Sequence, residues 1–311
     1  PEAVEVTTFD GRFVERKVPL PQRWLRGFAE AQVLAAGFTL RAEVPATEAA
    51  VLLRSIPPAI GCSGTGGTRW VVPEGRRLRP VLRPGRGAVC LPGAHRLSTL
   101  QPVLRYAQAV RIYAPAEPAV PSPEADGATA VAWEAILPGM RLTLVLSPSA
   151  ARGFSGEGGV LTDLATGAAA GDADLVCALL AWEPRIDVVE LSRMSGLPAG
   201  RVRAALTVLG TSGQIGYDLA EQAYFHRALP YRIGAAETLN PRLRAARALV
   251  EAGAVRVDGG LATVGTGDTR QTVRVDDAGQ LRCTCLWWAR YRGGRGPCKH
   301  ALAVGMVRQA A

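Results

Sequence analysis

The sequence lacks the signatures of the common enzyme classes. It contains no H-E-x-x-H metalloprotease motif and no G-x-S-x-G nucleophile motif, and two of its three histidines, His95 and His226, stand alone. The glycine-rich segment 153–159 is not followed by the Lys-Ser or Lys-Thr pair of a phosphate-binding P-loop. Because no nucleophile is paired with a base, we expect a protein that is not an enzyme and has no small-molecule substrate.

Long apolar runs and a secretory signal are absent as well. No stretch reaches the ~18 apolar residues of a membrane helix, and the opening PEAVEVTTFDGRF has no basic segment followed by an apolar one. The six cysteines do not make the framework of a secreted disulfide scaffold. We therefore expect no membrane contact and a cytoplasmic location, with Cys62, Cys90 and Cys177 structural or incidental rather than reactive.

What the sequence does contain is a dense group of metal ligands near its C-terminus. Cys283-x-Cys285 is followed, after twelve residues, by Cys298-x-His300. Thiolate and imidazole are ligands that Zn²⁺ prefers, and four of them close a tetrahedral structural site with no open position for catalysis. Residues two apart on a strand point to the same side, so the first pair can bind one ion together. The second pair can complete the site from the turn that opens the last helix. We predict one structural Zn²⁺, whose thiolate ligands require a reducing compartment.

This pattern, C-x-C-x12-C-x-H, resembles the SWIM zinc finger, whose signature is C-x-C, a variable gap and C-x-H. The resemblance implies a small β-β-α module that binds one zinc ion and contacts DNA or protein. The stretches 140–160 and 209–231 also resemble actinobacterial, hence bacterial, SWIM-finger proteins. In that family context the partners would include an AAA-type ATPase or a von Willebrand A-type protein. The resemblance implies a binding module and no particular activity.

The C-terminal segment is strongly basic. The chain has a formal net charge of +9, and residues 281–311 contain six Arg or Lys and no Asp or Glu. Aromatic and basic side chains together suit stacking on bases and pairing with phosphates. We predict a nucleic-acid surface, DNA more than RNA, formed by Trp287, Trp288, Arg290, Arg292, Arg295 and Lys299. Contact with a protein partner is the alternative, and a third is that the tryptophans form only the core of the module.

Hydrophobic periodicity and turn signals predict an α+β protein of several domains. We expect a mixed α+β N-terminal domain over residues 1–168, a winged-helix-like domain over 171–232, and a helix plus the zinc module over 235–311. The middle domain is inferred from three predicted helices followed by two strand-like runs. We expect Arg201, Arg203, Ala204 and Thr207 to face solvent on its third helix, 198–209. Asp218 and Glu221 on the following ribbon would repel DNA, which favours a protein partner for this domain.

Overall fold

The computed structural model describes residues 3–4, 18–19, 22–56, 69–83, 85–116, 129–148, 154, 156–157, 159–166, 169–180, 187–226, 240–266, 269–276 and 279–310. The chain forms two compact units, one comprising residues 37–157 and the other residues 1–36 together with 158–311. None of the described helices has the length and hydropathy needed to cross a membrane. Each unit is described by itself below.

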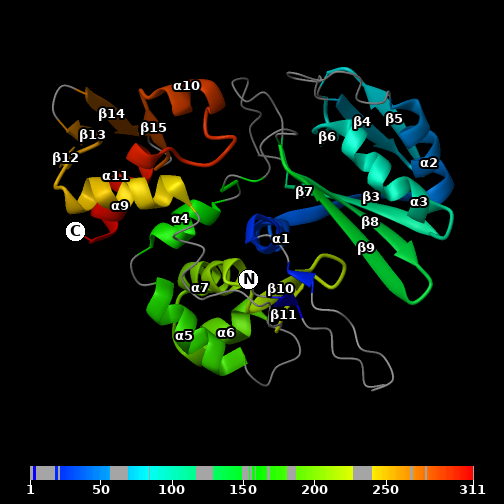
Figure 1. Ribbon diagram of the computed structural model, residues 1–311, viewed down its shortest axis with the longest axis horizontal. Helices are drawn as coiled ribbons and strands as arrows, with labels where there is room; N and C mark the ends of the chain where they lie inside the picture. The colour runs from blue at the N-terminus through cyan, green and yellow to red at the C-terminus, as the bar shows by residue number, and fades with distance from the viewer. Residues whose placement is uncertain are drawn as a thin grey trace. The chain divides into compact units, whose positions relative to one another are not determined.

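The unit formed by residues 37–157 contains two antiparallel sheets, with strand orders β3-β7-β8-β9 and β5-β4-β6 (Figure 1). Its core includes the fully buried side chains of Leu97, Ile112 and Trp133. Helices α2 and α3 and the 3-10 helix η1 complete the unit. Its elements are β3 (Phe38–Pro45), α2 (Ala46–Ser55), β4 (Arg69–Glu74), β5 (Arg77–Val81), β6 (Val89–Leu91), η1 (Ala94–Leu100), α3 (Gln101–Leu104), β7 (Ala109–Pro115), β8 (Val131–Leu137) and β9 (Met140–Leu146).

The second unit begins with a group of helices around α7. Helices α1, α4, α5 and α6 all contact α7, and the β10–β11 hairpin follows it. The sequence sets both ends of α6, because the Asp187 side chain caps its first turn and Gly196 adopts the left-handed conformation after its last. The elements are β1 (Ala3–Val4), β2 (Val18–Pro19), α1 (Gln22–Ala35), α4 (Val160–Ala165), α5 (Ala169–Leu180), α6 (Val188–Ser195), α7 (Ala199–Thr211), β10 (Ile215–Asp218) and β11 (Ala223–His226).

The C-terminal part of this unit is an antiparallel sheet in the order β12-β13-β14-β15, with three helices. The side chains of Ala262, Val264 and Val273 pack together with Ala301 and Val304 of the last helix in one core cluster. The sheet therefore supports the helix that follows the ligand segment. The elements are α9 (Pro241–Glu251), β12 (Val255–Asp258), β13 (Leu261–Thr266), β14 (Thr269–Val275), β15 (Leu281–Cys283), α10 (Leu286–Tyr291) and α11 (Lys299–Ala310).

The predicted α+β class is confirmed, and the three helices and hairpin of the middle region occur in the predicted order. The zinc module has four strands where the resemblance implied two. The sequence predicts one helix over residues 97–109; the structure has η1 and α3 up to residue 104, and residues 109–115 form the strand β7. The Asp10-Gly11 pair predicts a hairpin turn and the glycine-rich residues 61–68 predict a loop. Both segments, and Cys62, lie outside the described residues. The division into 1–168, 171–232 and 235–311 stays a prediction.

Candidate metal centre

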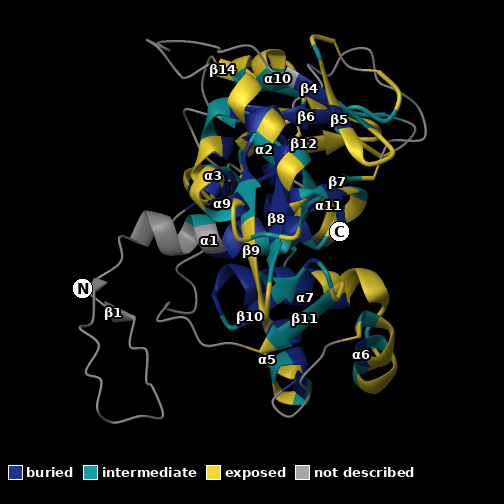
Figure 2. Cartoon of the chain, turned by 90° about the vertical axis from the view of Figure 1, so that its right-hand side faces the viewer, coloured by how far each residue is buried: buried dark blue, intermediate teal, exposed yellow. Residues whose placement is uncertain are grey.

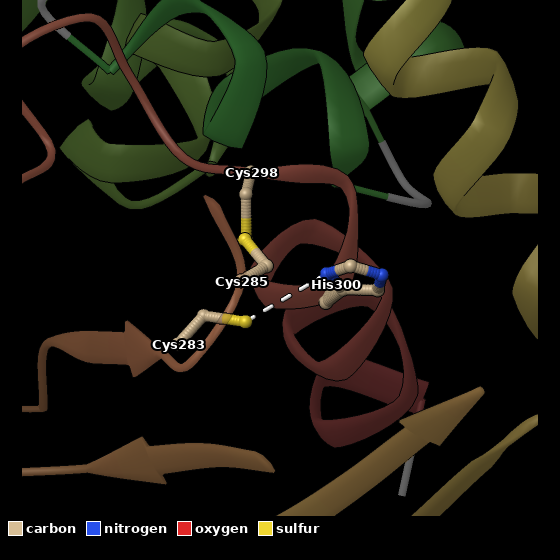
Figure 3. A group of neighbouring side chains, drawn as sticks. All are labelled: Cys283, Cys285, Cys298 and His300. Carbon is tan, nitrogen blue, oxygen red and sulfur yellow. Dashed lines mark hydrogen bonds between the residues drawn. The ribbon is translucent and has the colours of Figure 1, made fainter. Parts of the chain in front are cut away.

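Three short segments deliver the four predicted ligands (Figure 3). Cys283 is the last residue of β15, which is held in register by pairing with Val273 of β14. Cys285 is the N-cap residue of α10. Cys298 immediately precedes α11, and His300 lies in its first turn. The spacing C-x-C thus corresponds to a strand end followed by a helix start, and the spacing C-x-H to the opening of the last helix.

The ligand atoms are close enough to share one ion. The three sulfur atoms and an imidazole nitrogen all lie within 4.8 Å of one another, and Cys283 Sγ is 3.7 Å from His300 Nδ1. A zinc ion about 2.3 Å from each sulfur requires sulfur–sulfur distances of about 3.8 Å in a regular tetrahedron. All three cysteines are buried and the histidine is half-buried. The Cys3His cluster therefore fits one structural zinc ion, with four protein ligands and no open position.

The neighbouring side chains and backbone favour the thiolate form of Cys298 and the thiol forms of the other two cysteines. Hydrogen bonds from the Cys283 thiol, and then from His300 and the Ala301 amide, lower the pKa of Cys298 to about 4 against the opposing effect of burial. Burial raises the pKa of Cys285, and the hydrogen bond to Cys298 raises the pKa of Cys283. Zinc must therefore displace protons from these two thiols, so its affinity is expected to fall as pH decreases.

Aromatic and arginine side chains form a layer beside the cluster. The rings of Trp287 and Tyr291 have centroids 4.5 Å apart, and the Arg242 guanidinium lies 4.2 Å from the centroid of the Trp287 ring. Arg290 and Arg295 lie 5.4 and 5.7 Å from the centroid of the Tyr291 ring. Arg242 belongs to α9, and sequence reasoning missed it because no motif relates α9 to the ligands.

The six predicted nucleic-acid contacts differ in exposure. Arg290, Arg292 and Lys299 are exposed, whereas the Arg295 side chain is only 6% exposed. Trp287 and Trp288 are both half-buried and pack against the core cluster that contains the three cysteines. On an extended segment neighbouring side chains would face opposite sides, one buried and one exposed, but residues 286–291 form the helix α10 and both rings are half-buried.

The third helix of the middle region differs from its prediction. Arg201 and Arg203 of α7 are exposed as expected, but Ala204 and Thr207 are buried. Helices α1 and α4 contact α7, and the Thr207 hydroxyl donates a hydrogen bond of 2.8 Å to Asp163 of α4. Arg201 forms two hydrogen bonds, of 2.6 and 2.7 Å, with Asp172 of α5. Little of α7 beyond its first turn is therefore available to a partner.

Comparison with known proteins supports the zinc module. Residues 257–304 match the family model described as the SWIM zinc finger, and this segment contains all four ligands. No curated protein and no solved structure matches the chain. Sequence match and ligand geometry thus agree on a SWIM zinc finger that binds one zinc ion.

Proposed function

We propose that this chain is a non-enzymatic zinc protein that binds nucleic acid, DNA rather than RNA, through the basic surface of its SWIM zinc finger. The supporting observation is that Arg290, Arg292 and Lys299 are exposed within the segment that supplies the ligands. No Asp or Glu lies between residues 281 and 311 to offset their charge. A segment with a local excess of exposed positive side chains favours a polyanion as its partner. The three thiolate ligands suit a reducing setting such as the cytoplasm.

The aromatic side chains favour phosphate contacts over base stacking. Arg242 lies over the Trp287 ring, and two arginines lie near the Tyr291 ring. These rings are therefore in contact with arginines of the same chain, which leaves less ring surface for a base. Arginine and lysine that pair only with phosphates give binding that depends strongly on salt and little on base sequence. We therefore propose sequence-independent binding in which Arg290, Arg292 and Lys299 contact the phosphate backbone.

Fluorescence anisotropy with zinc-loaded protein tests this proposal. Three phosphate contacts give a slope of about −2.7 in log affinity against log salt, so raising salt from ~50 to ~200 mM should weaken duplex binding about 40-fold. A variant with Arg290→Ala, Arg292→Ala and Lys299→Ala should bind weakly and lose most of this slope.

The matched control removes the same charge from the other unit. Arg76, Arg77 and Arg83 are exposed and lie outside the zinc finger, so their replacement by Ala changes net charge equally. The control variant should retain the wild-type affinity and slope. An equal loss of DNA affinity in both variants would mean that only the net charge of the chain matters. Wild-type affinity in the zinc-finger variant would refute the proposal.

A second candidate is an adaptor that binds protein, including an AAA-type ATPase. Leu286, next to the ligand Cys285, is 88% exposed, and α6 exposes Val189 (76%) and Met194 (46%). Figure 2 shows exposed residues along α6. Exposed apolar side chains suit a protein partner better than DNA. On this reading α5–α7 and β10–β11 are a winged-helix-like unit that contacts protein, with α7 largely enclosed.

Site-specific photo-crosslinking distinguishes the two candidates. A crosslinking residue at position 286 should capture one defined protein in cells, whereas the same residue in place of the exposed Arg247 should not. Crosslinks to nucleic acid alone, or the same set of proteins from both positions, would argue against the adaptor.

A further inference from the structure

Arg242, which precedes the matched segment 257–304, is bound to the loop that leads into a zinc ligand. It lies in the first turn of α9, and its Nη1 donates hydrogen bonds to the carbonyl oxygens of Arg295 (3.0 Å) and Pro297 (2.6 Å). Pro297 is the residue before Cys298. The guanidinium therefore holds the backbone directly ahead of the third ligand.

Trp287 completes this arrangement. Its Nε1 donates a hydrogen bond of 3.2 Å to the carbonyl oxygen of Gly296, between the two carbonyl groups that Arg242 binds. The Arg242 guanidinium lies 4.2 Å from the centroid of the same indole ring, a distance at which cation–π attraction is effective. Two side chains in mutual contact thus bind three consecutive carbonyl groups of the ligand loop.

The loop between α10 and Cys298 turns sharply along its path. Arg292, Gly293 and Gly296 adopt left-handed backbone conformations, with φ of 47°, 83° and 73°. Its backbone hydrogen bonds are local turns, such as Gly294 N to Tyr291 O (2.7 Å) and Gly296 N to Gly293 O (2.9 Å). Local turns shape a loop but do not fix its end relative to the rest of the site. The contacts from Arg242 of α9 and Trp287 of α10 add a constraint from outside the loop.

We propose that Arg242 is a positioning residue of the zinc site, which fixes the approach of Cys298 by binding the loop carbonyl groups while stacked on Trp287. The zinc finger then includes α9, although α9 precedes the matched segment. This inference concerns metal binding alone and does not depend on what the zinc finger binds. Residues that orient metal ligands typically change metal affinity about 10- to 100-fold when they are replaced.

The test measures zinc release from the full chain into excess chelator. Arg242→Ala should release zinc about tenfold faster than the wild type. Arg242→Lys keeps the charge and can still donate hydrogen bonds, but it lacks the planar guanidinium that stacks on the Trp287 ring, so it should also release zinc faster. Arg244→Ala removes an exposed arginine from the same helix and should match the wild type.

Two further measurements separate positioning from general stabilisation. In the cobalt-substituted protein, Arg242→Ala should change the visible absorption of the tetrahedral site, because the position of a sulfur ligand is no longer fixed. The same variant should also narrow the difference in Tm between zinc-loaded and chelated protein, leaving the chelated Tm unchanged. Wild-type release and cobalt spectra, or equal losses of Tm in both forms, would overturn the proposal.

If Arg242→Ala does not fold, Trp287→Phe replaces it in the same assays. Phenylalanine retains an aromatic face for Arg242 but removes the hydrogen bond to Gly296. Zinc release should again be faster than in the wild type, and an unchanged rate would overturn the proposal.

Discussion

Cys298 is the zinc ligand that the fold encloses most completely. Its side chain is 1% exposed, and its sulfur accepts a hydrogen bond of 3.4 Å from the Ala301 amide at the start of α11. It therefore connects the ligand loop to the last helix as well as to the ion. Because small zinc modules derive on the order of 10 kcal/mol of folding free energy from the metal, the loss of one ligand affects folding as well as affinity.

Cys298→Ser should therefore abolish stoichiometric zinc binding and unfold the module. The zinc-to-protein ratio by elemental analysis and the helix signal by circular dichroism are the measurements. Cys177→Ser is the control, because Cys177 is half-buried on α5 and is not part of the ligand cluster. A Cys298→Ser protein that keeps one zinc ion per chain would contradict the assigned ligand set.

Asp163 of α4 is a second residue whose environment gives a directional prediction. Burial raises the pKa of its carboxyl group, against smaller opposing effects of the Thr207 hydrogen bond and the Arg203 charge. A carboxyl group whose pKa is higher in the folded state binds more protons when folded. Its contribution to stability therefore falls as pH rises from the unfolded pKa, about 3.9, through the folded one.

Asp163→Asn should consequently be more stable than the wild type at pH 7, by urea denaturation. The gain should shrink as pH is lowered toward the unfolded pKa, where the wild-type carboxyl group also becomes neutral. Comparing the two proteins at each pH cancels the pH dependence of zinc binding. Lower stability of Asp163→Asn at pH 7 would show that the carboxylate is stabilising.

The packing of α1 against α7 depends on a glycine. A Cβ atom at Gly210 of α7 would lie 2.3 Å from Cγ2 of Val33 on α1, closer than real Cβ contacts. Gly200, near the start of the same helix, is exposed and has no atom within 4 Å of its Cβ position. The two glycines thus allow the same substitution to be made in two different environments.

Gly210→Ala should destabilise the chain by about 1–3 kcal/mol, because the helices must separate or Val33 must leave its preferred rotamer. Gly200→Ala should be neutral or stabilising by up to about 1 kcal/mol, since alanine has the higher helix propensity. Thermal denaturation of both variants is the measurement. A destabilised Gly200→Ala, or an unaffected Gly210→Ala, would contradict the close contact between α1 and α7.

The elements predicted best from the sequence are those that neighbouring residues specify, through periodicity, helix-start residues or motif spacing. The sequence predicts a helix over 46–55 and, from Asn240-Pro241, the start of another, and α2 and α9 confirm both. The spacing of the zinc ligands predicts their cluster. The strand β7 was missed because its alternation is short: Ile112, Tyr113 and Ala114 are buried one after another, which breaks the period of two. Helix α10 has only six residues, too few for a periodic pattern.

Contacts between distant segments were not available from the sequence. In the sequence, nothing distinguishes Arg242 from the other arginines of α9. Its contact with the carbonyl groups of the ligand loop appears only in the folded structure. Likewise, Thr207 is buried, and its hydroxyl group binds Asp163 of α4, which lies 44 residues away in the chain. Motif spacing identified the metal ligands, whereas the residues that support them required the tertiary structure.

The zinc finger is part of the unit that contains it and not an appendage. Helix α11 contributes Ala301 and Val304 to the core around the ligands. It also contributes Leu302 and Ala303 to a second core with residues of α4 and α9, including Leu161 and Leu243. One helix thus faces both the metal cluster and the neighbouring helices, so the loss of zinc should affect α4 and α9 as well.

Removal of zinc by a chelator should therefore increase amide hydrogen exchange in α11, β15, α9 and α4, with a lower Tm for this unit. Residues 37–157 have a separate core, so exchange in β7 and β8 should not change. Hydrogen exchange with mass spectrometry, before and after chelation, measures each of these segments separately. The strands β7 and β8 are the internal control. Faster exchange confined to 281–300 would mean that the zinc finger folds independently of α9 and α4, and equal changes in β7 would mean that zinc stabilises the whole chain.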